Sequence, residues 1–239
     1  MKKKTVGILF LMVAVSAIFP ATDVICGNSS INELSAGVLT VTGSEAQENS
    51  FFGVVSRTKY LDRWGTMINH EKESLNDHLI ETARIAHMLV LIKNKKFGSN
   101  LNAERASVLA MYHDVTEIIT EDMPTTVKYG HPKMKSIYNE LDEKSVSELL
   151  SKMPEEFRDD FDSILNRKEE DQELWQIVKY ADKISAFIKC LRERSLGNRD
   201  FDGPFLRLEK FLLDVNAPEV EYFMKTFLPA YGYIYPENK

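Results

Sequence analysis

The stretch LNDHLIETARIAHMLVLIKNKKFG, residues 75–98, decides the fold class. Its apolar residues recur every three to four positions, which predicts an amphipathic α-helix with one face against a core. Gly98 follows the last periodic residue and is the residue type that most often ends a helix. We therefore expect a helix over this stretch, and we note that His78 lies beside its apolar face.

Similar patterns fill the rest of the chain. Asn102 is placed to cap a second helix, whose apolar stripe ends near His113. Pro132 and Pro154 each suit a first helical turn. Further helices are expected at residues 134–150, 157–165, 171–196, 205–215 and 220–228. Outside residues 37–43 no useful stretch alternates as a strand would, so the prediction is an all-α fold with a single globular helical bundle.

Composition limits the classes of partner. The 239 residues suit one sizeable domain, and 30 basic against 36 acidic residues give a net charge of -6. No Lys/Arg-rich run follows residue 4, so we expect no nucleic-acid partner. With only Cys26 and Cys190 in the chain, no disulfide framework is expected, which suits a reducing compartment.

The first 49 residues are expected to lie outside the helical domain. Residues 1–26 combine three lysines with an apolar run, the arrangement of a signal peptide or short N-terminal anchor that would contact a membrane. The run at residues 6–19 is shorter than the roughly 20 residues that a bilayer span needs. A buried helix or a mis-assigned start is the alternative. Residues 27–49 are small and polar, so we expect a flexible linker before a domain at residues 50–239.

A set of histidine and aspartate residues could meet at one point. His113 and Asp114 are adjacent near a predicted helix end, and together an imidazole and a carboxylate suit a divalent ion. Asp182 lies amid apolar residues on a helix whose other charged residues are expected to face outward, and an unpaired carboxylate there would be costly. Taken singly, such a histidine is usually a hydrogen-bonded core residue, as we expect for His87, and such an aspartate is usually a cap. The combination with His78 indicates a metal site.

The order H…HD…D resembles the HD-domain metal-dependent phosphohydrolases. Five segments are similar to the YfbR-type bacterial 5′-deoxyribonucleotidases: DRW at 62–64, FGSNLNAER at 97–105, LAMYHDVTE at 109–117, EDMPTTVKY at 121–129 and VKYAD at 178–182. The resemblance covers about residues 50–232. It implies an HD-domain helical bundle, a homodimer and a cytoplasmic location, unless residues 1–26 act as a signal. It also implies hydrolysis of deoxyribonucleoside 5′-monophosphates to deoxyribonucleoside and phosphate.

The resemblance also assigns roles at the centre of the site. It implies that one divalent ion (Co, Mn, Zn, Fe or Mg) is held by His78, His113, Asp114 and Asp182. Glu117, four residues after His113, is expected on the same helical face, where it would orient and deprotonate the attacking water. Asp122 would donate a proton to the departing O5′ oxygen.

Four further residues are expected to bind the substrate. Arg63 offers a planar fork of donors to two phosphate oxygens. In this family the neighbouring Trp64 would crowd the 2′ position so that deoxyribose is preferred, although core packing is the plain alternative. Thr125 and Lys128 would supplement phosphate binding.

Two alternative functions stay open. One is an HD enzyme that acts on another nucleotide: a dNTP, a cyclic nucleotide or an alarmone. Alarmone hydrolases usually carry a second acidic residue where Ile118 follows Glu117. The other is a non-catalytic nucleotide or metal sensor tethered by the N-terminal segment, although Glu117 and Asp122 are both present.

Overall fold

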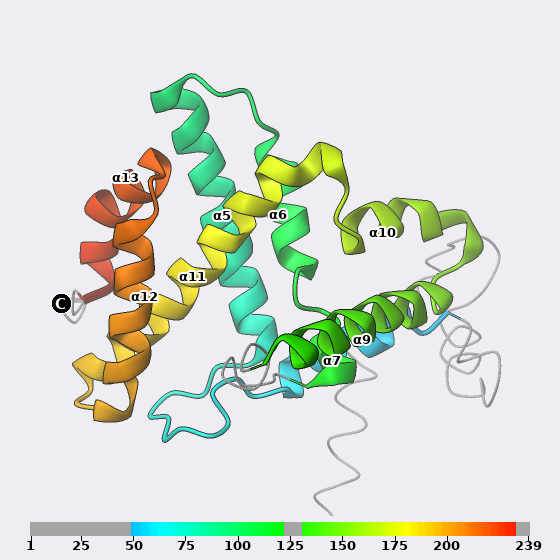
Figure 1. Ribbon diagram of the computed structural model, residues 1–239, viewed down its shortest axis with the longest axis horizontal. Helices are drawn as coiled ribbons and strands as arrows, with labels where there is room; N and C mark the ends of the chain where they lie inside the picture. Colours follow the sequence, from blue (N-terminus) through cyan, green and yellow to red (C-terminus); the bar gives the residue numbers. More distant parts are fainter. Residues whose placement is uncertain (1–48, 122–130, 233–239) are drawn as a thin grey trace, which may run out of the picture. The chain divides into compact units, whose positions relative to one another are not determined.

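The computed structural model describes residues 49–121 and 131–232, all within one compact unit, Glu48–Lys239. Its α-helices are α4 (Phe51–Val55), α5 (Leu75–Phe97), α6 (Ala103–Tyr112), α7 (Glu117–Thr120), α9 (Pro132–Ser151), α10 (Arg158–Leu165), α11 (Gln172–Ser195), α12 (Asp202–Asp214) and α13 (Pro218–Thr226) (Figure 1). Short 3₁₀ turns are η1 (Ser56–Tyr60), η2 (Glu155–Phe157), η3 (Glu169–Asp171), η4 (Arg199–Phe201) and η5 (Leu228–Gly232). Apart from one isolated bridge between Asp62 and Ser74, these residues contain no β-structure. The all-α prediction is confirmed.

The long helices α5 and α11 cross at the centre of this unit, with α6 packed against both (Figure 1). The predicted apolar stripe of α5 is buried, and its members belong to the main core: Leu79, Ala83, Ala86, Leu89 and Val90. Fully burying a leucine stabilises the fold by about 1.5–3 kcal/mol. A second cluster of Phe51, Val115, Leu149 and Met153 joins α4, the segment after α6, and α9. The chain just beyond His113 is therefore held by its own apolar contacts.

Several predicted helix boundaries are confirmed. Gly98 adopts the left-handed conformation (φ 73°) that ends α5, and the Asn102 side chain accepts the Arg105 N–H at the start of α6. Pro132 is the first residue of α9. Pro154 instead precedes the 3₁₀ turn η2, and α10 begins after that turn.

The prediction for Glu117 required a regular helix that continues past His113. The chain from residue 103 to residue 120 does not form such a helix. α6 ends at Tyr112, residues 113–116 form turns, and α7 begins at Glu117. At these turns the N–H groups of Val115 and Glu117 reach back three residues, to Tyr112 O at 3.1 Å and to Asp114 O at 3.0 Å. The prediction that His113 and Glu117 share one face of a regular helix is therefore wrong. Glu117 is nevertheless inside the protein, with 6% of its surface exposed.

The charged residues of α11 do not all face outward, contrary to expectation. Lys189 and Glu193 are buried, at 5% and 0% exposure, and their side chains pair at 2.6 Å. Glu193 also accepts the backbone N–H groups of His70 and Glu71, at 3.0 and 3.1 Å. A buried charge is stable only when it is paired and hydrogen-bonded. These bonds attach the segment before α5 to α11.

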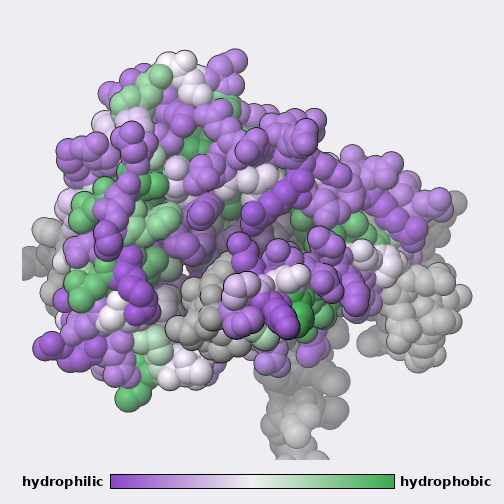
Figure 2. Space-filling view, in the orientation of Figure 1, coloured by the Kyte–Doolittle hydropathy of each residue, from purple (hydrophilic) through white to green (hydrophobic). Residues whose placement is uncertain are grey.

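The surface in Figure 2 is mainly hydrophilic, with apolar residues gathered over α12 and α13 at the left. On α12 the side chains of Leu206 and Leu213 are exposed. Among the described residues, no helix combines the length and the apolar character needed to cross a bilayer. Apart from Asn49, the predicted leader and linker lie outside the described residues, so their division stays a prediction.

Candidate metal centre

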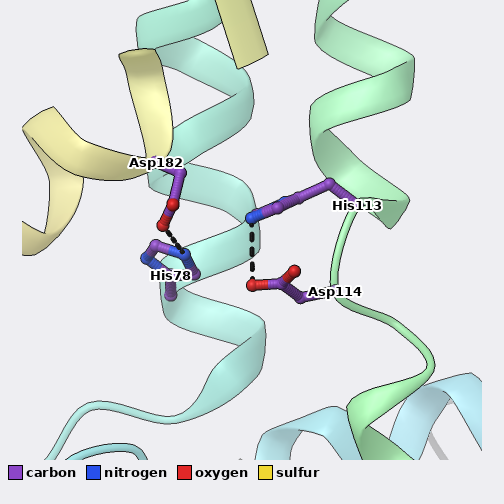
Figure 3. Close-up of side chains that lie close together, drawn as sticks. All are labelled: His78, His113, Asp114 and Asp182. Carbon is purple, nitrogen blue, oxygen red and sulfur yellow. Dashed lines mark ion pairs between the residues drawn. The ribbon is translucent and has the colours of Figure 1, made fainter. Parts of the chain in front are cut away.

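Four side chains from three helical segments converge at one point (Figure 3). They are His78 on α5, His113 and Asp114 at the end of α6, and Asp182 on α11. Their potential ligand atoms all lie within 4.8 Å of one another. The sequence predicted this set as metal ligands, and the geometry meets the first requirement for such a role. The role itself stays a prediction.

Hydrogen bonds select the tautomer of both histidines. His78 Nδ1 lies 3.1 Å from Ser185 Oγ, and that hydroxyl donates its own proton to Glu81 at 2.9 Å. Ser185 Oγ must therefore accept the Nδ1–H of His78. His113 Nδ1–H donates to the Ala110 carbonyl at 2.8 Å. Each ring thus has Nε2 available to bind a cation, as metal-ligating histidines usually do.

The Nε2 atoms provide a test of whether a cation fits. Both are buried and lack a hydrogen-bond partner. His78 Nε2 is 3.2 Å from Asp182 Oδ1, and His113 Nε2 is 3.1 Å from Asp114 Oδ2. A nitrogen lone pair that faces a carboxylate oxygen at this distance is repelled unless a proton or a cation lies between them. Two imidazoles and two carboxylates suit a divalent transition metal, so the residues fit the ion.

The protonation states of the four side chains differ. Burial lowers the pKa of His78 to about 4, so this imidazole is neutral at pH 7. Burial opposes the charged form of His113, but the neighbouring Asp114 outweighs it and raises the pKa of His113 to about 9. Burial likewise opposes ionisation of Asp114 and Asp182. The charged His113 ring beside Asp114 and the Lys183 ammonium, 2.7 Å from Asp182 Oδ2, nevertheless hold the pKa values of these carboxyl groups below the usual range. Both carboxylates are therefore ionised, and a metal ion would compete with a proton at His113.

We expect Ser185→Ala to weaken binding of Mn²⁺ by roughly 10- to 100-fold, the usual effect of removing the partner of a ligating histidine. The change frees the His78 ring from its hydrogen bond to Ser185. Isothermal titration calorimetry on EDTA-stripped protein measures the affinity. Ser195→Ala, on the same helix with an exposed hydroxyl that donates to Arg192 O, is the matched control. Equal affinities in the two variants would mean that Ser185 does not orient the ligand.

Of the predicted substrate-binding residues, Arg63 lies near this cluster, and Trp64 is the next residue in the chain. The Arg63 side chain is largely buried. Burial of His78 is the main cause of its lowered pKa, and the positive charge of Arg63 is the second cause. The Trp64 indole packs on the Phe201 ring with a centroid distance of 5.3 Å and donates its Nε1–H to Glu73 at 2.9 Å. Core packing therefore accounts for part of the Trp64 surface.

The remaining predicted residues are placed as follows. Glu117 begins α7, one turn beyond Asp114. Asp122, Thr125 and Lys128 lie outside the described residues.

Four residues that contact the predicted site residues or their partners were missed: Ser185, Glu81, Glu73 and Lys183, whose ammonium lies 2.7 Å from Asp182 Oδ2. Ser185 lies three residues after Asp182 on α11, so helical spacing could have indicated it. Glu73 carries no such signal.

Comparisons with known proteins point the same way as the geometry. A family model described as 5′-deoxynucleotidase YfbR-like matches residues 50–231. A 5′-deoxynucleotidase of Vibrio vulnificus is 43% identical over 185 residues, which are 77% of this chain and 95% of that protein. One of Photorhabdus laumondii is 43% identical over 182 residues, covering 76% and 92%. The crystal structure of an HD-domain phosphohydrolase from Listeria innocua superposes with a TM-score of 0.67 at 20% identity, covering 76% of this chain and 88% of its own, and shows the same fold.

Proposed function

Since the chain belongs to the YfbR-like family of 5′-deoxynucleotidases, we propose that the cluster of His78, His113, Asp114 and Asp182 is its catalytic centre. The protein is a phosphohydrolase that converts deoxyribonucleoside 5′-monophosphates to deoxyribonucleoside and phosphate. The single observation that supports this location is the convergence of four ligand atoms within 4.8 Å, with two buried Nε2 atoms that lack hydrogen-bond partners.

The cluster would hold one divalent ion. Such an ion, when bound, neutralises charge on the phosphoryl group and lowers the pKa of water. His78 and His113 supply Nε2 atoms whose orientation Ser185 and the Ala110 carbonyl maintain. Asp114 and Asp182 supply two negative charges that balance the charge of the ion. Mixed imidazole and carboxylate ligands accept Mn, Co, Fe and Zn better than Mg.

Glu117 is our candidate for the general base. A general base must lie within reach of the proton that it removes. Glu117 is buried and lies one turn after Asp114 in the chain. It would orient the attacking water and accept its proton. Asp122 would donate a proton to O5′ as the sugar departs, because an unprotonated alkoxide is a poor leaving group.

The phosphate would be bound by Arg63, whose guanidinium can donate to two oxygens at once. Its partly buried side chain, with 12% exposure, loses little conformational freedom when it binds. Thr125 and Lys128 would add donors to the same phosphate. Trp64, the next residue after Arg63, would then stand beside the sugar.

A phosphate-release assay tests the function directly. Parent protein loaded with Mn²⁺ or Co²⁺ is expected to release phosphate from dAMP, dGMP and TMP, and EDTA is expected to stop the release. The same panel should include a dNTP, a cyclic nucleotide and an alarmone. If metal-loaded protein released no phosphate from any monophosphate, the proposed nucleotidase activity would be rejected. The alternative of a nucleotide or metal sensor would then be favoured.

We expect Trp64→Ala to accept ribonucleotides better than the parent does. The ratio of kcat/KM for dAMP to kcat/KM for AMP should fall by roughly 10- to 100-fold, which is the range over which a pocket can discriminate by size against an added hydroxyl. Trp175→Phe, which changes the other tryptophan of the chain, is the control and should retain the ratio. An unchanged ratio in Trp64→Ala would rule out this residue as the sugar gate.

Assembly and location stay predictions. The family resemblance implies a homodimer, which size-exclusion chromatography with light scattering would test. N-terminal sequencing of protein isolated from cells would show whether residues 1–26 are removed.

A further inference from the structure

The segment that carries Arg63 and Trp64 is attached to the fold at both ends. Arg63 N donates to Glu73 O at 2.9 Å, and Leu75 N donates to Leu61 O at 2.8 Å, so the two ends of residues 61–75 pair with each other. Between these ends, Glu193 of α11 binds the backbone N–H groups of His70 and Glu71. The segment is thus a loop with a fixed base.

One side chain within this base contacts both predicted substrate-binding residues. Glu73 Oε2 accepts the Trp64 Nε1–H at 2.9 Å and lies 3.5 Å from Arg63 Nε. The side chains of Arg63 and Glu73 are only 12% and 11% exposed, so water screens their interaction weakly. Glu73 lies next to Nε of the guanidinium. An arginine that donates to two phosphate oxygens at once also uses a terminal nitrogen.

The backbone at Trp64 is strained. Its φ of 58° is in the left-handed region, which among the non-glycine residues described is shared only by Glu121. A bulky residue is held in this region only when its surroundings impose it. The Trp64 carbonyl accepts from Met67 N at 2.9 Å and from Asn69 Nδ2 at 3.1 Å. These two bonds fix the backbone, and the bond to Glu73 fixes the direction of the indole.

We infer that Glu73 is a positioning residue that sets the preference for deoxyribose, by fixing the Trp64 indole and the Arg63 guanidinium relative to each other. This inference rests on the proposed function, in which Trp64 stands beside the sugar and Arg63 binds the phosphate. Without the acceptor at Glu73 the indole can rotate about its side-chain bonds and make room for a 2′-hydroxyl. Glu73 touches neither the substrate nor the reacting atoms in this scheme.

Two variants of Glu73 separate its hydrogen bond from its charge. Glu73→Met keeps the volume and removes the carboxylate acceptor, whereas Glu73→Gln keeps an acceptor oxygen for the indole N–H and removes the charge. We expect Glu73→Met to lower the dAMP to AMP ratio of kcat/KM by roughly five- to tenfold, which corresponds to the loss of one hydrogen bond. Glu73→Gln should restore the ratio to within about twofold of the parent value. The matched control is Glu71→Gln, two residues away with an exposed side chain.

The substrate ratio distinguishes positioning from a merely structural role. Damage to the fold would lower the activity on dAMP and AMP alike and would leave their ratio unchanged. An unchanged ratio in Glu73→Met therefore overturns the inference. If Trp64→Ala loses the preference while Glu73→Met retains it, only the role of Glu73 fails. If the parent hydrolyses no monophosphate, the proposed function fails first.

Fluorescence supplies a readout that does not depend on activity. In a Trp175→Phe background Trp64 is the only tryptophan. Quenching by acrylamide should increase in Glu73→Met and stay at the parent level in Glu73→Gln, and equal quenching in all three proteins would contradict the inference. Should Glu73→Met fail to fold, Glu73→Leu removes the same acceptor and leaves Trp64 intact. A lowered ratio in Glu73→Leu then supports the inference, and the parent ratio overturns it.

Discussion

Asp182→Asn is expected to abolish phosphate release from dAMP, with a loss of more than about 10³-fold. The substitution keeps the shape of the side chain but removes one of the two negative charges at the cluster. A metal ion contributes several kcal/mol to stabilising phosphoryl charge, and each 1.36 kcal/mol corresponds to a factor of ten in rate. Asp182 Oδ1 lies 3.2 Å from His78 Nε2, so its loss affects the atoms that would share the ion.

Binding of the ion gives an independent measurement for this variant. A ligand that binds only the folded state at 100 times its dissociation constant stabilises that state by about 2.7 kcal/mol. For a chain of this size the midpoint of thermal unfolding should therefore rise by roughly 5–10 °C when Mn²⁺ is added to the parent. Asp182→Asn should lose both this rise and the recovery of activity after EDTA treatment. Asp214→Asn, at an exposed position on α12, should keep both.

Full activity in Asp182→Asn would mean that the catalytic centre lies elsewhere. Loss of activity with the parent rise in unfolding temperature would place Asp182 in catalysis but outside the ligand set. The two measurements together therefore test the location of the centre and the role of this residue separately.

The helices of this protein could be predicted because their signals are local. An apolar stripe, a glycine at position 98 and an asparagine at position 102 act within one or two turns, and the structure confirms each of them. The break between α6 and α7 could not be predicted in this way. Val115 is buried and Ile118 packs against the same cluster, so the apolar pattern continues across the turns as it would along a regular helix.

The cluster itself could be predicted because each member conflicts with its surroundings. A histidine or an aspartate on an apolar face needs a partner, and this conflict is visible in the sequence. Glu73 and Glu193 show no such conflict, since glutamates in a polar segment or near a helix end are usually solvated. Their burial depends on partners distant in the chain, as in the contact of Glu193 with His70, 123 residues away. Local patterns contain no information about such pairs.

Glu117→Gln is expected to lower kcat for dAMP by about 10²- to 10⁴-fold, the usual contribution of a general base. The amide has the same size as the carboxylate, so this buried position should tolerate it, but the amide cannot accept a proton from water at neutral pH. Because Glu117 follows the ligands without belonging to them, the variant should still bind Mn²⁺ and dAMP. A fall in kcat with little change in KM or metal affinity is therefore the expected pattern.

The position of Glu117 makes this pattern specific. It begins α7 directly after the turns that carry Asp114, and Val115 attaches those turns to the second apolar cluster. If Glu117 only supported the turns, its replacement would disturb Asp114 and weaken binding of the ion together with turnover. Calorimetry with Mn²⁺ separates the two cases, and Glu104→Gln, an exposed glutamate in the first turn of α6, is the control. If Glu117→Gln turned over dAMP at the parent rate, Glu117 would not be the general base, because the amide of this variant cannot accept a proton from the water.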